Sequence, residues 1–163
     1  MINKKSTNIY AFTLIELLCV VSLLALICAI AAPAFRDLSH RRNLNIAARS
    51  MATEMRKVQQ RAIMAGCGQI IEFVSSNRYR VTDGKTEERY NVFLPEGITI
   101  RNVNFPRFEN VHYLRFNYNG SPSSGGTVTF ENSGGDLLYV IVAPVTGRVR
   151  ISEDPPEHWE FEP

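Results

Sequence analysis

The hydrophobic and polar positions divide the chain into three regions with different periodicities. Residues 12–35 form an almost unbroken apolar run, in which Glu16 is the only charged side chain. At about 1.5 Å per residue, a helix of this length reaches roughly 36 Å, enough to cross a hydrocarbon core of about 30 Å. The first region is therefore predicted to be a membrane-spanning helix with one carboxylate close to its start.

The second region, residues 36–66, keeps a helical period but is mostly polar. Its apolar residues recur at alternating spacings of four and three, which places them in one narrow stripe. We expect the stripe to pack on the domain's own sheet, with the basic residues of the other face solvated or, for Arg36, Arg41 and Arg42, close to lipid headgroups. Contact with a partner protein is the alternative for these basic residues. The stripe consists of Leu44, Ala48, Met51, Met55, Val58 and Ala62.

Two residues are expected to shape this long helix. Pro33 should bend it, because proline removes a backbone donor and clashes with the preceding turn. Gly66 or Gly68 should end it, because glycine readily adopts the conformation that follows a helix.

The third region consists of short runs rich in β-branched and aromatic residues, separated by turn residues such as Asp83-Gly84 and Asn119-Gly120. Eight short strands predict a sandwich or a strongly bent sheet. The predicted strands are residues 69–74, 79–82, 90–93, 98–103, 113–118, 127–131, 137–143 and 148–151.

The single carboxylate of the apolar run suggests a function for the first region. A carboxylate at the bilayer centre costs about 3 kcal/mol, and less toward the interface. Glu16 is therefore expected to have a role, although a carboxylate that reaches water at the interface is the alternative.

The start of the apolar run resembles the prepilin leader and N-terminal helix of type IV pilins and pseudopilins. The resemblance implies cleavage between Ala11 and Phe12 by a prepilin peptidase that also N-methylates Phe12. Ala11 departs from the family, which usually has glycine before the cut. The matching residues are Phe12, Thr13, Leu14, Ile15, Glu16 and Pro33.

Two other interpretations use the same residues. A secretory signal would have Lys4 and Lys5 as its basic part and Ala32-Pro33-Ala34 as its cleavage site, but its apolar core would be about 7–15 residues long and would not contain Glu16. An unprocessed membrane anchor is the second alternative. Loop charge does not fix the orientation, because basic residues flank both ends of the run.

The β-rich region resembles the GspH/FimT family of minor pilins and pseudopilins. The similar segments are Phe116-Asn117-Tyr118-Asn119-Gly120, Gly126-Thr127-Val128, Leu138-Tyr139-Val140-Ile141-Val142 and Thr146-Gly147-Arg148-Val149-Arg150. The resemblance implies an α+β fold, in which a long N-terminal transmembrane helix continues into an amphipathic helix packed on an antiparallel β-sandwich. The implied division is a leader over 1–11, a transmembrane and filament-core helix over 12–35, an amphipathic helix over 36–66 and a β-rich domain with an acidic tail over 67–163.

The function implied by these resemblances is that of a structural and assembly subunit of a type II secretion pseudopilus or a type IV pilus. In the family, Glu16 pairs with the α-amino group of the Phe12 of a neighbouring subunit, and Pro33 belongs to the assembly helix. The implied partners are other pilins in a tip complex, the prepilin peptidase, the inner-membrane assembly platform and membrane lipids. The implied location is the bacterial inner membrane, crossed once, with the globular domain on the periplasmic side until the subunit enters the filament.

DNA binding during natural transformation is the alternative function. The segment Gly147-Arg148-Val149-Arg150 is similar to a basic segment through which the FimT branch takes up DNA. Arg148 and Arg150 alternate along a predicted strand, so both would face one side and could contact phosphates. They could equally be solvent-facing residues of an edge strand. The tail that follows opposes DNA, since its charged residues are all acidic: Glu153, Asp154, Glu157, Glu160 and Glu162.

Composition gives no support for an enzyme, a cofactor or a metal site. His40, His112 and His158 are isolated from one another and from Cys67, which excludes the common metal-ligand spacings. Cys19 and Cys28 lie in the apolar run, so the rest of the chain has no cysteine pair to form a disulfide. The net charge of +2 hides a basic segment around 36–61 and the acidic tail.

Overall fold

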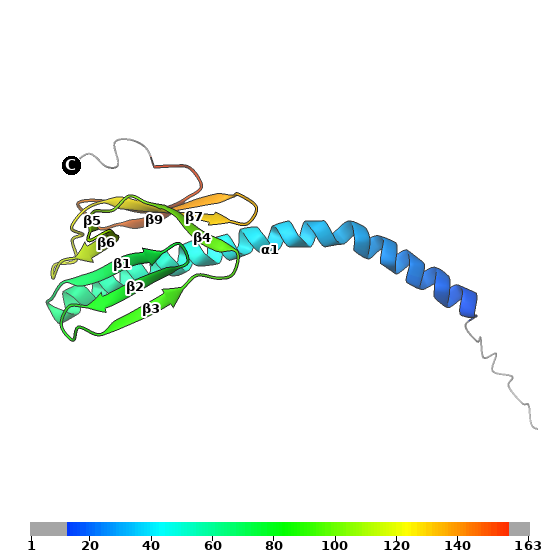
Figure 1. The fold of residues 1–163 in the computed structure, drawn as a ribbon, viewed down its shortest axis with the longest axis horizontal. Helices are drawn as coiled ribbons and strands as arrows, with labels where there is room; N and C mark the ends of the chain where they lie inside the picture. The colour runs from blue at the N-terminus through cyan, green and yellow to red at the C-terminus, as the bar shows by residue number, and fades with distance from the viewer. Residues whose placement is uncertain (1–12, 157–163) are drawn as a thin grey trace, which may run out of the picture. The chain divides into compact units, whose positions relative to one another are not determined.

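The structure is a computed structural model that describes residues 13–156, with the backbone alone over residues 31–38. Its helix α1 spans Leu14–Ala65 and is followed by β-strands (Figure 1). The chain divides into two compact units, one ending at Asp37 and the other beginning at Leu38. Gly66 ends the helix as predicted: its φ is +64°, and its N–H donates a hydrogen bond to the carbonyl of Ile63.

The strands form two antiparallel sheets. The first sheet has the order β3-β2-β1-β6-β5 and the second has the order β4-β7-β8-β9. The strands of the first sheet are β1 (Gln69–Ser75), β2 (Arg78–Asp83), β3 (Arg89–Phe93), β5 (Arg107–Phe108) and β6 (Val111–Phe116). Those of the second are β4 (Ile98–Val103), β7 (Gly126–Asn132), β8 (Leu137–Val142) and β9 (Val149–Ser152).

The second half of α1 forms one core with both sheets. The predicted stripe is fully confirmed, since each of its residues is at most 4% exposed. Ala47 and Ala52 widen it, and small side chains there let the helix approach the sheets closely. The sheets contribute alternate residues to this core, such as Ile71 and Leu114 from the first sheet and Val128 from the second.

All eight predicted strands are present, and one further strand was missed. β5 consists of Arg107 and Phe108 and pairs only with β6. Two exposed residues after Pro106 carry no alternating pattern, so the sequence gives no indication of this strand.

The transmembrane part of the predicted fold is not confirmed. Over the part of the chain that the structure describes, no helix meets the combined length and hydropathy of a membrane-spanning segment. The assignment of residues 12–35 to a membrane helix therefore stays a prediction.

Candidate functional site

The first candidate site is the start of α1. The Thr13 hydroxyl accepts a hydrogen bond from the Glu16 N–H at 3.2 Å, which makes Thr13 the N-cap of the helix. A threonine followed three residues later by glutamate is the capping-box spacing, and it explains why the helix begins at Leu14. Ala11 and Phe12, the predicted processing site, lie outside the described residues.

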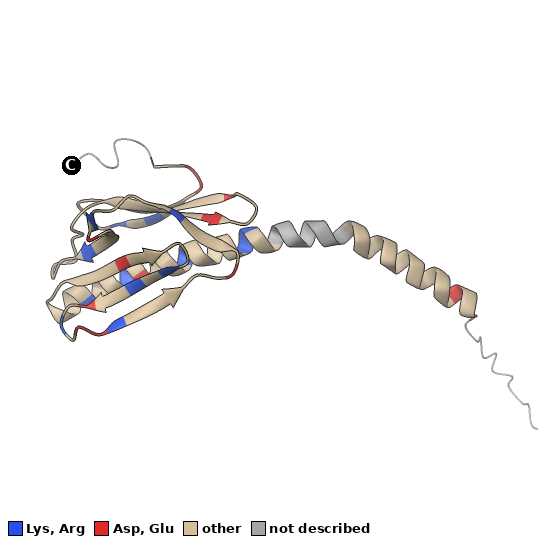
Figure 2. Ribbon diagram, in the orientation of Figure 1, with Lys and Arg blue, Asp and Glu red and all other residues tan. Residues whose placement is uncertain are grey.

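Glu16 is the one charged side chain of residues 13–30, as the single acidic colour at the start of α1 in Figure 2 shows. Its place in the first turn suits a carboxylate, because the backbone dipoles at a helix N-terminus favour negative charge. Ser22, a polar neighbour in the same run, satisfies its hydroxyl by donating to the carbonyl of Leu18 at 2.8 Å. Glu16 is thus the one charged group on the apolar surface of residues 13–30.

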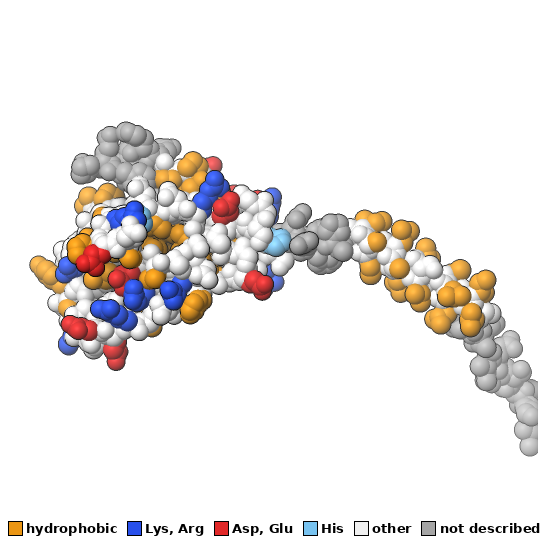
Figure 3. All heavy atoms as spheres, viewed as in Figure 1, with side chains coloured by type: hydrophobic (Ala, Val, Ile, Leu, Met, Phe, Trp, Pro, Cys, Tyr) orange, Lys and Arg blue, Asp and Glu red, His pale blue; other side chains and the backbone are white. Residues whose placement is uncertain are grey.

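The side chains around Glu16 form an exposed apolar surface. Every residue from Thr13 to Ile30 is exposed, with Leu14 at 77% and Ile30 at 72% (Figure 3). An apolar surface of this extent marks a site that lipid or another protein covers. Pro33 also lies within α1, but in the stretch whose side chains are not described, so its predicted bend stays a prediction.

The second candidate site is the arginine segment at β9. Gly147 adopts a φ of +64° in the turn between β8 and β9, where its N–H donates to the carbonyl of Ala143. Val149 points into the core and is 5% exposed, whereas Arg148 is exposed and Arg150 is half-buried. Arg150 therefore lies on the outer face of β9, whereas Arg148 precedes the strand, so the shared face of the two arginines stays a prediction.

The polar face of α1 makes hydrogen bonds to the domain that the sequence does not predict. Arg56 donates to the carbonyl of Val149 at 2.9 Å, and Gln59 donates to the carbonyl of Gly120 at 2.8 Å. Arg61 donates to the Tyr90 hydroxyl at 2.8 Å. Arg56 and Arg61 are exposed, as expected for this face, and they also hydrogen-bond to their own domain, which the sequence does not predict.

Tyr90 links this face of α1 to the edge strand β3. Its hydroxyl accepts from Arg61 and donates to the Glu54 carboxylate at 2.7 Å. Burial and the hydrogen bond to Glu54 raise the pKa of Tyr90, and the hydrogen bond to Tyr90 raises the pKa of Arg61. Nothing in the sequence marks Tyr90, which looks like any aromatic strand residue.

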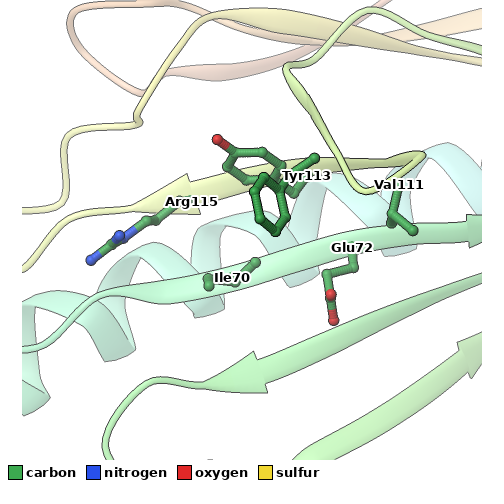
Figure 4. Close-up of a pocket in the computed structure, with 6 residues that line it drawn as sticks. Ile70, Glu72, Val111, Tyr113 and Arg115 are labelled. Atoms are coloured by element: carbon green, nitrogen blue, oxygen red, sulfur yellow. The ribbon is translucent and has the colours of Figure 1, made fainter.

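A small hollow lies on the outer face of the first sheet (Figure 4). It has a volume of about 250 Å³ and is lined by Ile70, Glu72, Phe108, Val111, Tyr113 and Arg115. Glu72 forms an ion pair with Arg80 at 3.0 Å and accepts from Thr82, so its carboxylate is already engaged. Over residues 13–156 the structure contains no group of three or more potential metal-binding side chains, and the three cysteines are unbonded.

The β-rich domain and the adjoining half of α1 match a family model described as type II transport protein GspH, over residues 47–147. The chain belongs to this family. The match spans the buried stripe from Ala47 onward and ends just before Arg148, so it does not include the arginine segment. No curated protein matches the chain.

Two solved structures are similar to this member of the GspH family. The minor pseudopilin EpsH from the type 2 secretion system of Vibrio cholerae is 18% identical, with a TM-score of 0.52 over 68% of this chain and 96% of that chain. The type IV minor pilin FimU of Pseudomonas aeruginosa is 14% identical, with a TM-score of 0.52 over 72% of this chain and 92% of that chain. These similarities confirm the pilin-like α+β fold, and with the family match they support a minor pseudopilin or pilin.

Proposed function

We propose that this chain is a minor pseudopilin or minor pilin that enters a filament through residues 12–35 and displays its GspH-type domain on it. The observation that carries the proposal is the surface of α1 from Leu14 to Ile30. It is exposed and apolar on all sides, and it carries one charge. A domain whose own core is complete does not need such a surface, whereas a helix that packs among other helices does.

Processing is the first step of the proposed mechanism. A prepilin peptidase cuts between Ala11 and Phe12 and methylates the new amino group of Phe12. Thr13 then becomes the second residue, and its cap starts α1 immediately after the new terminus. Before assembly the helix resides in the inner membrane, with the globular domain on the periplasmic side.

Glu16 guides subunit addition in this mechanism. A carboxylate on an apolar surface is costly when alone, and an ammonium group in the same setting is costly too. When the Glu16 of one subunit meets the Phe12 amino group of its neighbour, each charge offsets the desolvation of the other. The pair thereby fixes the axial register of the incoming subunit.

The N-terminus of the mature protein provides the first test. Intact-mass and N-terminal peptide mass spectrometry on protein from membranes that contain a prepilin peptidase should find N-methylated Phe12 as the first residue. A chain that still begins at Met1, or one cut near Ala34, would contradict the proposed processing.

The second test separates the Glu16 charge from its surroundings. Glu16→Gln keeps the size of the side chain and should abolish cross-linking to other pilin subunits, while membrane levels stay normal. Ser22→Ala is the matched control, because Ser22 is the other strongly polar residue of the same surface and should retain assembly. Normal assembly of Glu16→Gln would sink the charge-pairing mechanism.

DNA binding through Arg148 and Arg150 remains a second proposal, supported by the exposure of Arg148 just before β9 and by the outward position of Arg150 on that strand. Two phosphate contacts alone give weak, salt-sensitive binding, so several copies or further arginines would be required. Charge reversal at both positions should spare assembly. It should reduce DNA retention in a filter assay only if this second proposal holds.

A further inference from the structure

The outer edge of β3 has no partner strand among the described residues. In Figure 1 β3 is the outermost strand of the first sheet, and it pairs with β2 without a register shift. Just beyond β3, the N–H of Leu94 donates to the carbonyl of Asn77. Just before it, the carbonyl of Glu88 accepts from the N–H of Asp83. Because backbone groups alternate in direction along a strand, those that point away from β2 belong to alternate residues of β3: Arg89, Asn91 and Phe93.

The N–H and C=O groups of these three residues find no hydrogen-bond partner in the part of the chain that the structure describes. All three residues are exposed, so the edge is open. The strand is nevertheless fixed in position, because the Tyr90 hydroxyl bonds to α1 and Val92 packs against the core. An open edge that is held in place is a template on which another strand can pair.

The other edges of the two described sheets are less suited to strand pairing. β5 consists of two residues. β4 contains a register shift between Ile100 and Asn102, and the Ile100 N–H already donates to the carbonyl of Ser76. β9 has four residues and is soon followed by Pro155 and Pro156, which cannot donate to a ladder. β3 has five residues and contains no bulge, proline or lysine, the features that usually protect an edge.

The side chains beside the open edge indicate the chemistry of a partner. Arg89 and Phe93 lie at the two ends of β3 and share its outer face with Asn91. Phe93 is 65% exposed, and the guanidinium of Arg78 lies 5.9 Å from its ring centroid. Arg89 forms no ion pair within the described residues. A strand added here is therefore favoured if it places an acidic side chain opposite Arg89 and an apolar one opposite Phe93.

We propose that the open edge of β3 binds an extended segment of a neighbouring protein, which adds a strand to the first sheet. The segment runs antiparallel to β3, and each of Arg89, Asn91 and Phe93 exchanges two backbone hydrogen bonds with the residue opposite. A polypeptide is the fitting ligand, because its backbone repeats donors and acceptors at the spacing of a strand. This inference goes beyond the proposed function and does not depend on it, since β3 lies outside the apolar surface of α1.

A designed peptide tests the proposal on the full-length protein in detergent micelles. The probe is Phe-Val-Thr-Val-Glu-amide with a fluorophore on its N-terminus, so that its Glu lies opposite Arg89 and its Phe opposite Phe93. Fluorescence anisotropy should show saturable binding. N-methylation of the Thr and Glu amides, which would face β3, should weaken binding about tenfold or more. N-methylation of the two Val amides, which would face away, is the matched control and should leave binding unchanged. No saturable binding, or equal binding of all three peptides, would overturn the proposal.

Substitutions in β3 locate the probe on this edge. Asn91→Pro removes the outward N–H and leaves the ladder with β2 intact, because Asn91 donates nothing to β2. It should weaken binding about tenfold, whereas Asn91→Ala keeps the N–H and should bind as the unaltered protein does. Arg89→Glu should weaken binding of the probe and favour a probe with Lys in place of Glu. Circular dichroism verifies that each variant is folded.

Two results would contradict the proposal even if the probe binds. Affinity that is insensitive to both Asn91→Pro and Arg89→Glu would place the probe on another surface, such as the hollow of the first sheet. Dimerisation of the full-length protein that Asn91→Pro abolishes would show that the edge pairs with β3 of a second copy, not with a neighbouring protein.

Discussion

The two halves of α1 are one continuous helix with opposite surfaces. From Leu14 to Ile30 the helix is apolar on every side and exposed, whereas from Leu44 to Ala62 it is polar except for one stripe, which is buried. The second half contributes to the stability of the domain. The first half contributes no residue to that core, and its side chains from Leu14 to Ile30 are exposed.

The comparison shows that apolar residues in the two halves of this helix indicate different surroundings. A stripe at spacings of three and four indicates a partner within the chain, because one face suffices to cover a domain's core. An apolar surface on all sides indicates surroundings that are apolar on all sides. The first half is therefore where substitutions should affect assembly without affecting stability.

The largest expected contrast comes from one truncation in each half. Met55→Ala removes a fully buried side chain and should lower the free energy of unfolding by about 2–5 kcal/mol. Leu24→Ala, at an exposed position, should change it by less than about 0.5 kcal/mol. Denaturant unfolding in detergent, followed by circular dichroism, measures both. Equal losses would mean that the first half also contributes to the domain's core.

A smaller effect is expected where a loop closes on the end of the second half. Gly120 has a φ of +81°, and a Cβ there would lie 2.6 Å from the Cδ1 of Ile63. Gly120→Ala should cost about 1–3 kcal/mol, because backbone strain adds to overpacking against α1. The same unfolding assay applies.

Gly135→Ala is the control for Gly120→Ala, since its φ of +85° gives similar strain but nothing lies within 4 Å of the added Cβ. It should cost less than Gly120→Ala. Adding Ile63→Ala should recover part of the loss at Gly120, and the absence of any recovery would show that the contact with α1 is not the cause.

The hydroxyl of Tyr90 offers a test of the polar face of the second half. Tyr90→Phe removes the hydrogen bonds to Glu54 and Arg61 and should cost about 1 kcal/mol. Tyr118→Phe is the control, because Tyr118 is 68% exposed, and it should have little effect on thermal unfolding. Identical melting of both variants would mean that the network does not hold β3 to the helix.

The smallest effect is expected at Asp83, the last residue of β2. The N–H groups of Lys85 and Thr86 donate to its carboxylate and lower its pKa. Because the folded pKa lies below the unfolded value of about 3.9, the stabilisation is present above that pH and is lost as pH falls through the folded pKa. Asp83→Asn should flatten the acid dependence of unfolding there, and an unchanged dependence would contradict this assignment.

Periodicity was sufficient to predict the main elements of the fold. The spacing of apolar residues along the chain predicts both the stripe from Leu44 to Ala62 and the eight strands. This spacing is regular because one face of each element is buried in the core. β5 could not be predicted, because its two exposed residues are held by pairing with β6 rather than by their own pattern.

The candidate sites were predictable where a residue is exceptional in its surroundings. Glu16 stands alone in an apolar run, and the outward position of Arg150 follows from its place beside the buried Val149 in β9. The partners of Arg56 and Arg61 were not predictable, since Val149 and Tyr90 are distant in sequence and carry no special composition. Tertiary contacts of this kind depend on the topology.

The hydrogen bond between Arg56 and Val149 joins residues 93 positions apart. The helix that organises the core is made first, and the strand that it binds is made almost last. Long-range pairing of this kind slows folding, because the loop must close before the contact forms. A nascent chain therefore cannot complete the core around the stripe until β9 emerges, and a chain that terminates before β9 would lack both Val149 in the core and the partner of Arg56.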